Sequence, residues 1–325
     1  MKILVTGGAG LIGLEVCKQL AESRHEVCLF DLRKPILRIN QFLPDKSNIK
    51  IFYGSILNPD HLRSAMIGCD AVIHLAALLG VKRSEEERLS CLEINIDGTK
   101  NVLDCAVQQK VKKVVFSSSS EVYGEPLKNP ITEEAITQGK TIYAVTKLVG
   151  EEFCKAYKQE HDLDFVILRY FNCYGPFQTA QFVLPKFIKN VRENRPPVIY
   201  GNGKQVRSYT FVSDTARATI LAVLSKKANG EIINIGNGDS PINLKDLAEL
   251  VIRIGGKQKK FKPEFRGFEN SDRNKKREIV KRFCDSRKAE RILNWKPKIS
   301  LREGIKIVFN SHLFNLWEDF PEEQN

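Results

Sequence analysis

The segment Lys2-Ile3-Leu4-Val5-Thr6-Gly7-Gly8-Ala9-Gly10-Leu11-Ile12-Gly13 decides the fold of this chain. Its first residues form a short apolar run that predicts a buried strand, and the apolar spacing after Gly13 predicts a helix. Glycines between the two permit a tight turn, a close approach of the backbone to a pyrophosphate, and close helix–strand packing. The helix then directs its N-terminus at the anion. We therefore predict a dinucleotide site that includes Gly7, Gly10, Leu11, Ile12 and Gly13.

A second predicted strand, residues 26–30, ends in Asp31. This is the place, after such a glycine turn, where an acidic side chain accepts a hydrogen bond from a ribose hydroxyl. Because Asp31 would repel a 2′-phosphate, NAD is the predicted cofactor rather than NADP. Arg33 and Lys34, which follow after Leu32, weaken this preference, but we interpret both as part of a solvated loop.

Strand and helix patterns alternate through the first half of the chain. We predict strands at 49–53, 71–75, 113–116 and 164–169, and helices at 59–66 and 141–159. Residues 84–109 are predicted to form one long helix or two. Repeated βαβ units imply an α/β fold with a doubly wound parallel sheet of the Rossmann type. After Tyr170 the pattern becomes irregular, with strands predicted at 206–212 and 231–235 and helices at 183–193, 214–224, 244–254, 286–293 and 301–309.

The change of pattern predicts two domains. Residues 1–170 form an NAD-binding Rossmann domain, to which residues 206–235 return. Residues 171–205 and 236–325 form a smaller, mixed α/β substrate domain. This C-terminal part is expected to cover the open end of the sheet and close over a substrate.

The composition excludes several classes of protein. A chain of 325 residues with 42% hydrophobic and 28% charged residues is typical of a soluble enzyme. No apolar run approaches the roughly 20 residues of a membrane helix, and no signal core is evident, so we expect a cytoplasmic protein without membrane contact. The eight cysteines form no C-x-x-C pair and the histidines show no ligand spacing. We predict reduced thiols and no metal site.

Most of the net charge of +12 lies between residues 251 and 300. A nucleic-acid or membrane-surface patch is one interpretation. No RNA-binding aromatic motif or zinc knuckle accompanies the charge, however. We therefore favour a solvated face with a few arginines for an anionic small molecule, and do not expect a nucleic-acid partner.

A predicted strand and a predicted helix carry residues suited to oxidising an alcohol. The apolar run 114–116 leads into four serines, 117–120, followed by Glu121. Tyr143 and Lys147 are four positions apart, so they lie on one face of a helix. A nearby ammonium favours the phenolate, and a serine hydroxyl at the strand end can hydrogen-bond the same reacting oxygen. Together they predict removal of a proton from a substrate alcohol while hydride leaves the carbon.

These motifs together resemble the extended short-chain dehydrogenase/reductases, and among them the NAD-dependent nucleotide-sugar epimerase/dehydratase family. The resemblance covers nearly the whole chain. The motifs that carry it are the glycine turn, Asp31, Val72–Ala77, Asn95–Thr99, Ser117–Gly124, Tyr143-x-x-x-Lys147, Asn172–Pro176, Arg207, Phe211–Asp214 and Asn294–Gly304.

The resemblance implies a role for individual residues. Tyr143 is the catalytic base, Lys147 lowers its pKa and holds the nicotinamide ribose, and Ser119 hydrogen-bonds the sugar 4-oxygen. Further cofactor contacts are implied for Ser55, Ile56, Leu75, Ala76 and Ala77. The diphosphate of a nucleotide-sugar substrate is implied to bind Asn172, Arg207 and either Arg277 or Arg282.

Two positions depart from the family pattern. Ser55 stands where many relatives have an aspartate that contacts adenine, and Phe177 stands where they often have an arginine. His74 is interpreted as a structural histidine at a strand end. The resemblance also implies a homodimer that pairs through the helix before Phe116 and the helix that carries Tyr143.

Members of the family first oxidise C4 of the sugar, and a further acid or base then decides the reaction. Here Ser119-Ser120-Glu121 resembles the motif of 4,6-dehydratases. The leading hypothesis is that Glu121 removes the C5 proton and water leaves from C6, so that a 4-keto-6-deoxy sugar forms. Ser120 is a poor acid for the leaving hydroxyl, and Glu121 itself or a water is the alternative. A 4-epimerase and a decarboxylase remain as alternatives, and Arg282 resembles an arginine of one decarboxylase family. Outside enzymes, an NAD- or RNA-binding regulatory module has only the basic 251–300 window as support.

The dehydratase hypothesis makes a direct prediction about Glu121. Glu121→Gln should abolish dehydration and leave slow C4 oxidation, because only the C5 proton transfer needs the carboxylate. Mass spectrometry of nucleotide sugars after incubation with the variant measures the loss of water. Full turnover by this variant would remove the reason for preferring a dehydratase.

Overall fold

Seven parallel strands form the centre of the computed structural model, which describes residues 1–43, 48–178, 182–267 and 279–311. Their order across the sheet is β11-β6-β5-β4-β1-β2-β3, which is the predicted doubly wound Rossmann arrangement. The strands are β1 (Lys2–Thr6), β2 (Glu26–Asp31), β3 (Ile49–Tyr53), β4 (Ala71–His74), β5 (Lys113–Ser119), β6 (Asp164–Tyr170) and β11 (Glu231–Ile235).

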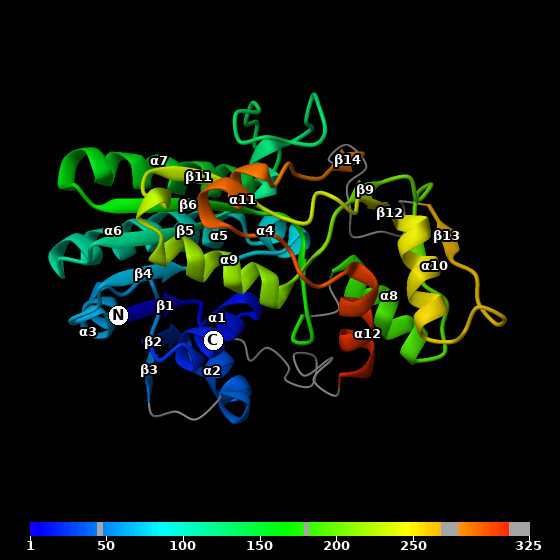
Figure 1. Cartoon of the computed structure of the whole chain (residues 1–325), viewed down its shortest axis with the longest axis horizontal. Coiled ribbons are helices and arrows are strands. Elements are labelled where there is room, and N and C mark those ends of the chain that lie inside the picture. The colour runs from blue at the N-terminus through cyan, green and yellow to red at the C-terminus, as the bar shows by residue number, and fades with distance from the viewer. Residues whose placement is uncertain (44–47, 179–181, 268–278, 312–325) are drawn as a thin grey trace.

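Helices cover both faces of this sheet, as Figure 1 shows. Successive strand residues point to opposite faces, so Ile3 and Val5 pack in one apolar layer and Leu4 in the other. The first layer contains α1 (Leu11–Glu22), α2 (Arg33–Ile39), α9 (Val212–Leu224) and α11 (Arg287–Leu293). The second contains α3 (Pro59–Met66), α6 (Gly98–Gln108) and α7 (Ile142–His161).

One local prediction was wrong. Arg33 and Lys34 begin α2 instead of a solvated loop, because Ile36 and Ile39 bury one face of that helix in the core. The segment 84–109, predicted as one helix or two, is divided further: α4 (Val81–Glu86) and α5 (Arg88–Leu92) precede the π-helical η3 (Glu93–Asp97) and α6. Within η3 the buried Asn95 side chain accepts from Leu78 N (2.8 Å) and donates to Leu78 O (3.0 Å), which ties this segment to the chain after β4.

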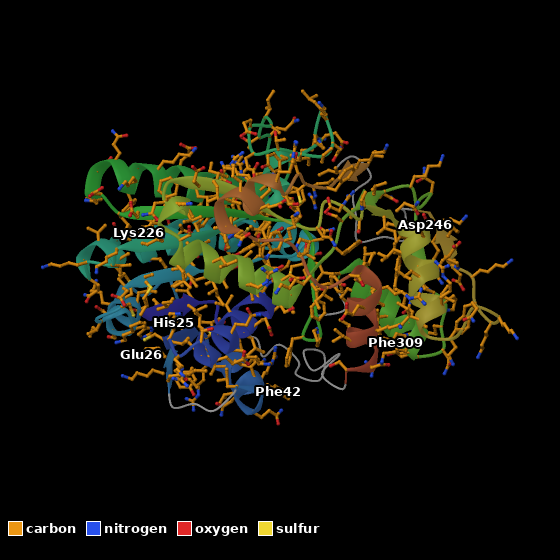
Figure 2. All side chains as sticks on the ribbon, in the orientation of Figure 1. His25, Glu26, Phe42, Lys226, Asp246 and Phe309 are labelled. Atoms are coloured by element: carbon orange, nitrogen blue, oxygen red, sulfur yellow. The ribbon has the colours of Figure 1, made fainter. Side chains whose placement is uncertain are left out.

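A second lobe lies beyond the carboxyl ends of the strands, on the right in Figure 1. It packs α8 (Val183–Arg192), α10 (Leu244–Ile254) and α12 (Leu301–Asn310) around a separate apolar core. Asp246 and Phe309 mark this lobe in Figure 2, whereas His25 and Glu26 mark the opposite side of the molecule. Short 3-10 helices are η1 (Asn40–Phe42), η4 (Ser120–Tyr123) and η5 (Lys226–Ala228).

Short strands connect the two lobes. The predicted strand 206–212 is divided into β9 (Val206–Arg207) and β10 (Thr210–Phe211), and each pairs elsewhere. β9 lies between β12 (Ile242–Asn243) and β14 (Lys281–Arg282), β10 pairs with β7 (Cys173–Tyr174), and β8 (Val198–Tyr200) pairs with β13 (Glu264–Arg266). In the segment 206–235, which was predicted to return to the first domain, α9 packs on the large sheet and β11 is one of its strands. The exact domain boundaries stay a prediction.

A buried ion pair attaches α7 to the sheet. Arg169 of β6 donates from Nε (2.9 Å) and Nη2 (2.6 Å) to the two carboxylate oxygens of Glu151 on α7. Ser118 of β5 donates to the same carboxylate (2.5 Å), and Arg169 Nη1 donates to Tyr123 Oη (2.9 Å). The side chains of Arg169 and Glu151 are only 5% and 2% exposed. Each charge therefore depends on the other for its burial.

This pair predicts non-additive losses of stability. Arg169→Met should lower the free energy of unfolding by about 3–5 kcal/mol, because it leaves the Glu151 carboxylate buried without a counter-charge. The double variant Arg169→Met, Glu151→Leu should recover most of that loss. Urea unfolding of both single variants and the double variant tests this. A double variant whose loss equals the sum of the single losses would contradict the coupling.

Candidate active site

The glycine turn between β1 and α1 is shaped by close backbone contacts. Gly7 has a φ of +70°, and a Cβ at Gly13 would lie 2.1 Å from Gly7 O. No described side chain caps the N-terminus of α1, whose N-cap residue is Gly10. Side chains at these glycines would fill the turn, so their absence leaves a concave backbone surface. The backbone N–H groups at the N-terminus of α1 are available there to bind an anion. These features fit the pyrophosphate of NAD.

Asp31 supports this turn from the end of β2. Its carboxylate accepts hydrogen bonds from Ala9 N (3.0 Å) and Leu32 N (2.8 Å). Burial raises the pKa of Asp31, and the two backbone bonds act in the opposite direction. Each carboxylate oxygen has a further acceptor position. Asp31 can therefore bind the turn and a ribose hydroxyl together.

His74 has the structural role that the sequence predicted. Its Nδ1 lies 2.7 Å from Thr6 Oγ1 and its Nε2 lies 3.0 Å from Thr99 Oγ1. Burial and the nearby Lys147 lower the pKa of His74 to about 3. The ring is therefore neutral, with both nitrogens hydrogen-bonded, at the end of β4.

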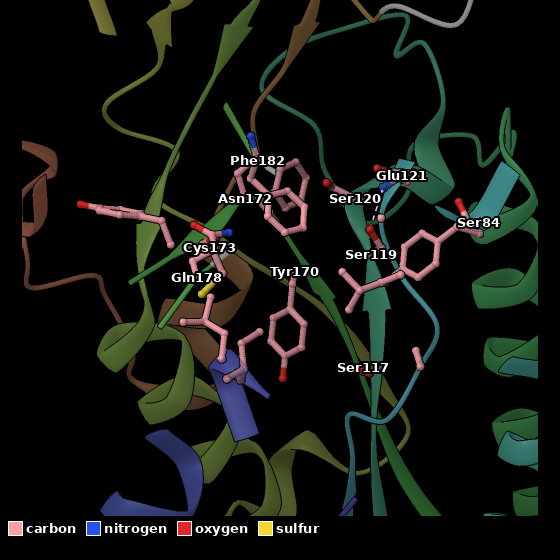
Figure 3. Close-up of a pocket in the computed structure, with 18 of the residues that line it drawn as sticks. Ser84, Ser117, Ser119, Ser120, Glu121, Tyr170, Asn172, Cys173, Gln178 and Phe182 are labelled. Carbon is pink, nitrogen blue, oxygen red and sulfur yellow. Dashed lines mark hydrogen bonds between the residues drawn. The ribbon is translucent and has the colours of Figure 1, made fainter. Parts of the chain in front are cut away.

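A cavity of about 920 Å³ extends from the glycine turn to the second lobe. Figure 3 shows part of its lining, with Ser119, Glu121 and Asn172 around the same space. The predicted site residues that line it are Gly7, Gly10, Leu11, Ile12, Gly13, Leu75, Ala77, Ser119, Ser120, Glu121, Tyr143, Lys147, Asn172, Arg207 and Arg282.

Four predicted cofactor residues do not line this cavity: Asp31, Ser55, Ile56 and Ala76. The Ser55 hydroxyl accepts from Leu57 N (3.1 Å). The Ile56 side chain packs directly against Gly98, because a Cβ at Gly98 would lie 2.5 Å from Ile56 Cδ1. Arg277 lies outside the described residues. In the part of the chain that the structure describes, no group of His, Cys, Asp and Glu side chains could hold a metal ion, and no helix is long and apolar enough to cross a membrane.

Ser119, Tyr143 and Lys147 meet where the end of β5 faces the start of α7. Tyr143 forms a side-chain hydrogen bond with Ser119, which also accepts from Glu121 N (3.2 Å), the dashed line in Figure 3. Lys147 Nζ lies 3.4 Å from Ser117 Oγ and 5.6 Å from the centroid of the Tyr143 ring. The i, i+4 spacing thus brings phenol and ammonium to one wall of the cavity.

Burial dominates the ionisation of this pair. It raises the pKa of Tyr143, as do the nearby Glu121 and Cys91, while the hydrogen bond with Ser119 lowers it. Burial also lowers the pKa of Lys147 to about 8. The pKa of Tyr143 thus rises in the described structure, whereas the sequence predicted a lowering by Lys147, because burial removes the phenolate from water.

Glu121 joins the two lobes across the cavity. Its Oε2 accepts from Thr141 Oγ1 (3.2 Å), and its Oε1 lies 3.9 Å from Arg282 Nη2. The Arg282 side chain is 11% exposed, and its buried Nε has no hydrogen-bond partner among the described residues. No local pattern in the sequence predicts this pairing. Only Thr141 had a local signal, as an N-cap that accepts from Ala144 N (3.1 Å) before the helical pattern begins.

The other predicted substrate residues lie beside this pair. Arg207 on β9 is in register with Arg282 on β14. Its guanidinium donates to the backbone oxygens of Val206 (2.8 Å) and Ile279 (2.7 Å). Phe177, which replaces the arginine of many relatives, is buried and packs edge-on against Phe42 at 5.2 Å. This position therefore contributes apolar packing in place of a charge.

The fold and the cavity define a dinucleotide-binding enzyme of the Rossmann class. The chain belongs to the NAD dependent epimerase/dehydratase family, whose model matches residues 3–236. It is thus an NAD-dependent enzyme of the nucleotide-sugar epimerase, dehydratase and decarboxylase group.

Relatives with different reactions are similar over most of their length. The UDP-N-acetyl-alpha-D-glucosaminuronate decarboxylase of Bacillus cytotoxicus is 35% identical, covering 94% of this chain and 95% of the relative. The dTDP-glucose 4,6-dehydratase of Streptomyces niveus is 33% identical, covering 79% and 78%. The structure of UDP-glucuronic acid 4-epimerase from Bacillus cereus with UDP-glucuronic acid and NAD has a TM-score of 0.86 and 31% identity, covering 98% and 100%.

The lowered pKa of Lys147 predicts opposite changes in stability and activity. A lysine whose pKa falls on folding destabilises the folded state when charged, so stability rises with pH between about 8 and the unfolded value. Lys147→Met should remove that rise and stabilise the protein at pH 7, by on the order of 3 kcal/mol at most, while abolishing turnover. Unfolding at pH 7 and pH 9.5 measures this. Lys155→Met on the exposed side of α7 is the control, and equal pH profiles for Lys147→Met and wild type would contradict the prediction.

Proposed function

We propose that this enzyme decarboxylates a nucleotide sugar that carries a carboxylate at C6. The observation that carries the proposal is the Arg282–Glu121 pair in the cavity, next to Ser119 and Tyr143. A buried guanidinium whose Nε lacks a partner favours a second anion. A substrate carboxylate beside the reacting carbon supplies that anion.

The shared wall of the cavity prepares C4 for the reaction. Tyr143 takes the proton of the C4 hydroxyl, and Ser119 hydrogen-bonds the same oxygen. NAD, when bound, supplies the hydride acceptor, and its positively charged ring favours the phenolate form of Tyr143. Gly7, Gly10 and Gly13 hold its pyrophosphate, Asp31 a ribose hydroxyl, and Lys147 the nicotinamide ribose.

The resulting 4-ketone makes loss of CO₂ easy. The C6 carboxylate is then β to the ketone, so the C5–C6 bond breaks and its electron pair passes to C4 oxygen as an enolate. Hydroxyls of Tyr143 and Ser119 stabilise that oxygen by hydrogen bonds. A proton from solvent added at C5 gives a 4-keto pentose, and return of the hydride to C4 would regenerate the oxidised cofactor. No base is needed to break this bond, which leaves Arg282 to bind and orient the carboxylate.

The same geometry argues against dehydration, which the sequence analysis preferred. Loss of the C6 hydroxyl needs an acid to protonate the leaving group. Beside Glu121 stand Ser120, a neutral and buried hydroxyl, and Arg282, which does not give up its proton. Decarboxylation needs no such acid, because CO₂ leaves without one.

The substrate class follows from the relatives and from the remaining arginine. Two relatives are named for UDP-N-acetylglucosaminuronate and UDP-glucuronate, and both of these sugars carry a C6 carboxylate. We propose a UDP-linked uronate, with Asn172 and Arg207 at the diphosphate. Pairing of two chains as a homodimer stays a prediction.

Arg282→Met should show whether Arg282 binds the sugar carboxylate or the diphosphate of the substrate. We expect affinity for UDP-glucuronate, or for its 2-acetamido analogue if the wild type prefers it, to fall by about 10- to 100-fold, since a charge-assisted pair is lost. Affinity for the matching neutral sugar nucleotide should change less than about threefold. Calorimetry measures both affinities, and mass spectrometry detects the loss of CO₂ from the uronate in the wild type.

Three other outcomes would count against the proposal. Equal loss of affinity for acid and neutral sugars would assign Arg282 to the diphosphate. Loss of water from a neutral sugar nucleotide would restore the dehydratase hypothesis. An unchanged mass with an altered sugar NMR spectrum would indicate epimerisation. Arg302→Met, an exposed arginine on α12, is the matched control and should leave both affinities unchanged.

A further inference from the structure

The loop between η4 and α7, residues 124–141, lies against the strand that carries Arg282. In Figure 1 this green loop rises above the sheet next to β14. It starts directly after the segment that contains Glu121 and ends at Thr141, whose hydroxyl donates to that same carboxylate. The loop therefore connects Glu121 to Tyr143 along the chain. It also contacts both the Glu121 carboxylate and the strand that carries Arg282.

One side chain of the loop brackets Arg282. Asn129 Nδ2 donates to Lys281 O (3.3 Å), and Asn129 Oδ1 accepts from Phe283 N (3.2 Å). Lys281 and Phe283 are the two neighbours of Arg282 in the chain. A single amide thus imitates a paired strand at this position and holds the backbone on both sides of the arginine.

Backbone pairing continues the contact two residues on. Ile131 N donates to Phe283 O (2.9 Å), and Asp285 N donates to Ile131 O (2.8 Å). On its other edge the Arg282 strand pairs with β9 in the second lobe, where Val206 N donates to Val280 O (2.8 Å). The strand is therefore held between the loop and the second lobe.

The loop is itself fixed to the large sheet. Ile131 is fully buried, and Asn234 of β11 donates to Ile131 O (3.0 Å). Asn234 N donates to the Glu133 carboxylate (2.8 Å), and Arg169 of β6 donates to Glu133 O (3.2 Å). Because the sheet also carries Ser119, this chain of contacts sets the position of Arg282 relative to the catalytic hydroxyls.

We propose that Asn129 is a positioning residue that sets the preference of this enzyme for acidic sugars, an inference that rests on the proposed binding of a C6 carboxylate by Arg282. Asn129 does not line the cavity. It holds the Arg282 backbone so that the guanidinium lines the cavity with Nη2 3.9 Å from Glu121 Oε1. Without it the strand is held on one edge only at this position, and the guanidinium can turn fully toward Glu121.

Asn129→Ala tests the proposal by comparing an acid with its neutral counterpart. We expect the Kd of the UDP-uronate to rise about tenfold, since two backbone hydrogen bonds that orient one charge are lost, and that of the neutral sugar nucleotide to change less than about twofold. Calorimetry gives both values, with the affinity for UDP alone as a check of folding. Leu127→Ala, whose side chain is 88% exposed on the same loop, is the control and should change neither value.

Asn129→Asp provides the second variant. It keeps the acceptor for Phe283 N, loses the donor to Lys281 O, and should give a smaller loss of uronate affinity in the same direction. If Asn129→Ala does not fold, the acid-to-neutral affinity ratio of Asn129→Asp decides: a lowered ratio supports the positioning role and an unchanged one overturns it. Equal losses for acid and neutral sugars in either folded variant also overturn it.

The proposed function is judged from the wild type alone. A wild type that prefers the acid but releases no CO₂ refutes decarboxylation, while a lowered ratio in Asn129→Ala still supports the positioning role. A wild type that releases CO₂ with an unchanged ratio in Asn129→Ala supports decarboxylation and refutes the role of Asn129. Equal wild-type affinity for acid and neutral sugars overturns both.

Discussion

The placement of α7 on the sheet is the constraint on which the site depends. Helix propensity alone puts Tyr143 and Lys147 on one face, but it does not set where that face lies relative to β5. Glu151, on the same helix, is held by Arg169 and Ser118 in the buried interior. Because neither charge can return to water without unfolding this region, the helix has one position along the strand. Tyr143 consequently meets Ser119.

Burial gives the same residues their chemical character. The wall that brings phenol and ammonium together also buries them, so the pKa of Tyr143 is raised and that of Lys147 falls to about 8. A phenol in this environment is a base only when further positive charge is near. The cofactor that this family uses carries such a charge, so binding of NAD and readiness for proton transfer are physically linked. His74, in contrast, is neutral and hydrogen-bonded at both nitrogens, and takes no part in this balance.

Members of one family can differ in reaction because C4 chemistry and the later step use different parts of the molecule. Ser119, Tyr143 and the glycine turn belong to the Rossmann sheet and its helices. Arg282 arrives from the second lobe, and the 124–141 loop holds its strand against the sheet. Under the proposed function, a change of this arginine, of Glu121 or of the loop would alter the step at C5 and C6 and leave the Ser119–Tyr143 wall unchanged.

Much of this protein was predictable from local sequence. The strand, glycine turn and helix at the N-terminus, the parallel sheet and the Tyr143–Lys147 spacing all depend on short-range periodicity and backbone sterics, which a sequence displays directly. Tertiary structure alone decided the interruption of the 84–109 helix at Asn95, the direction of the Tyr143 pKa shift, and the approach of Arg282 to Glu121. Each of these depends on burial or on contacts between residues far apart in the chain. Their energies come from the three-dimensional surroundings of a side chain, which no local pattern records.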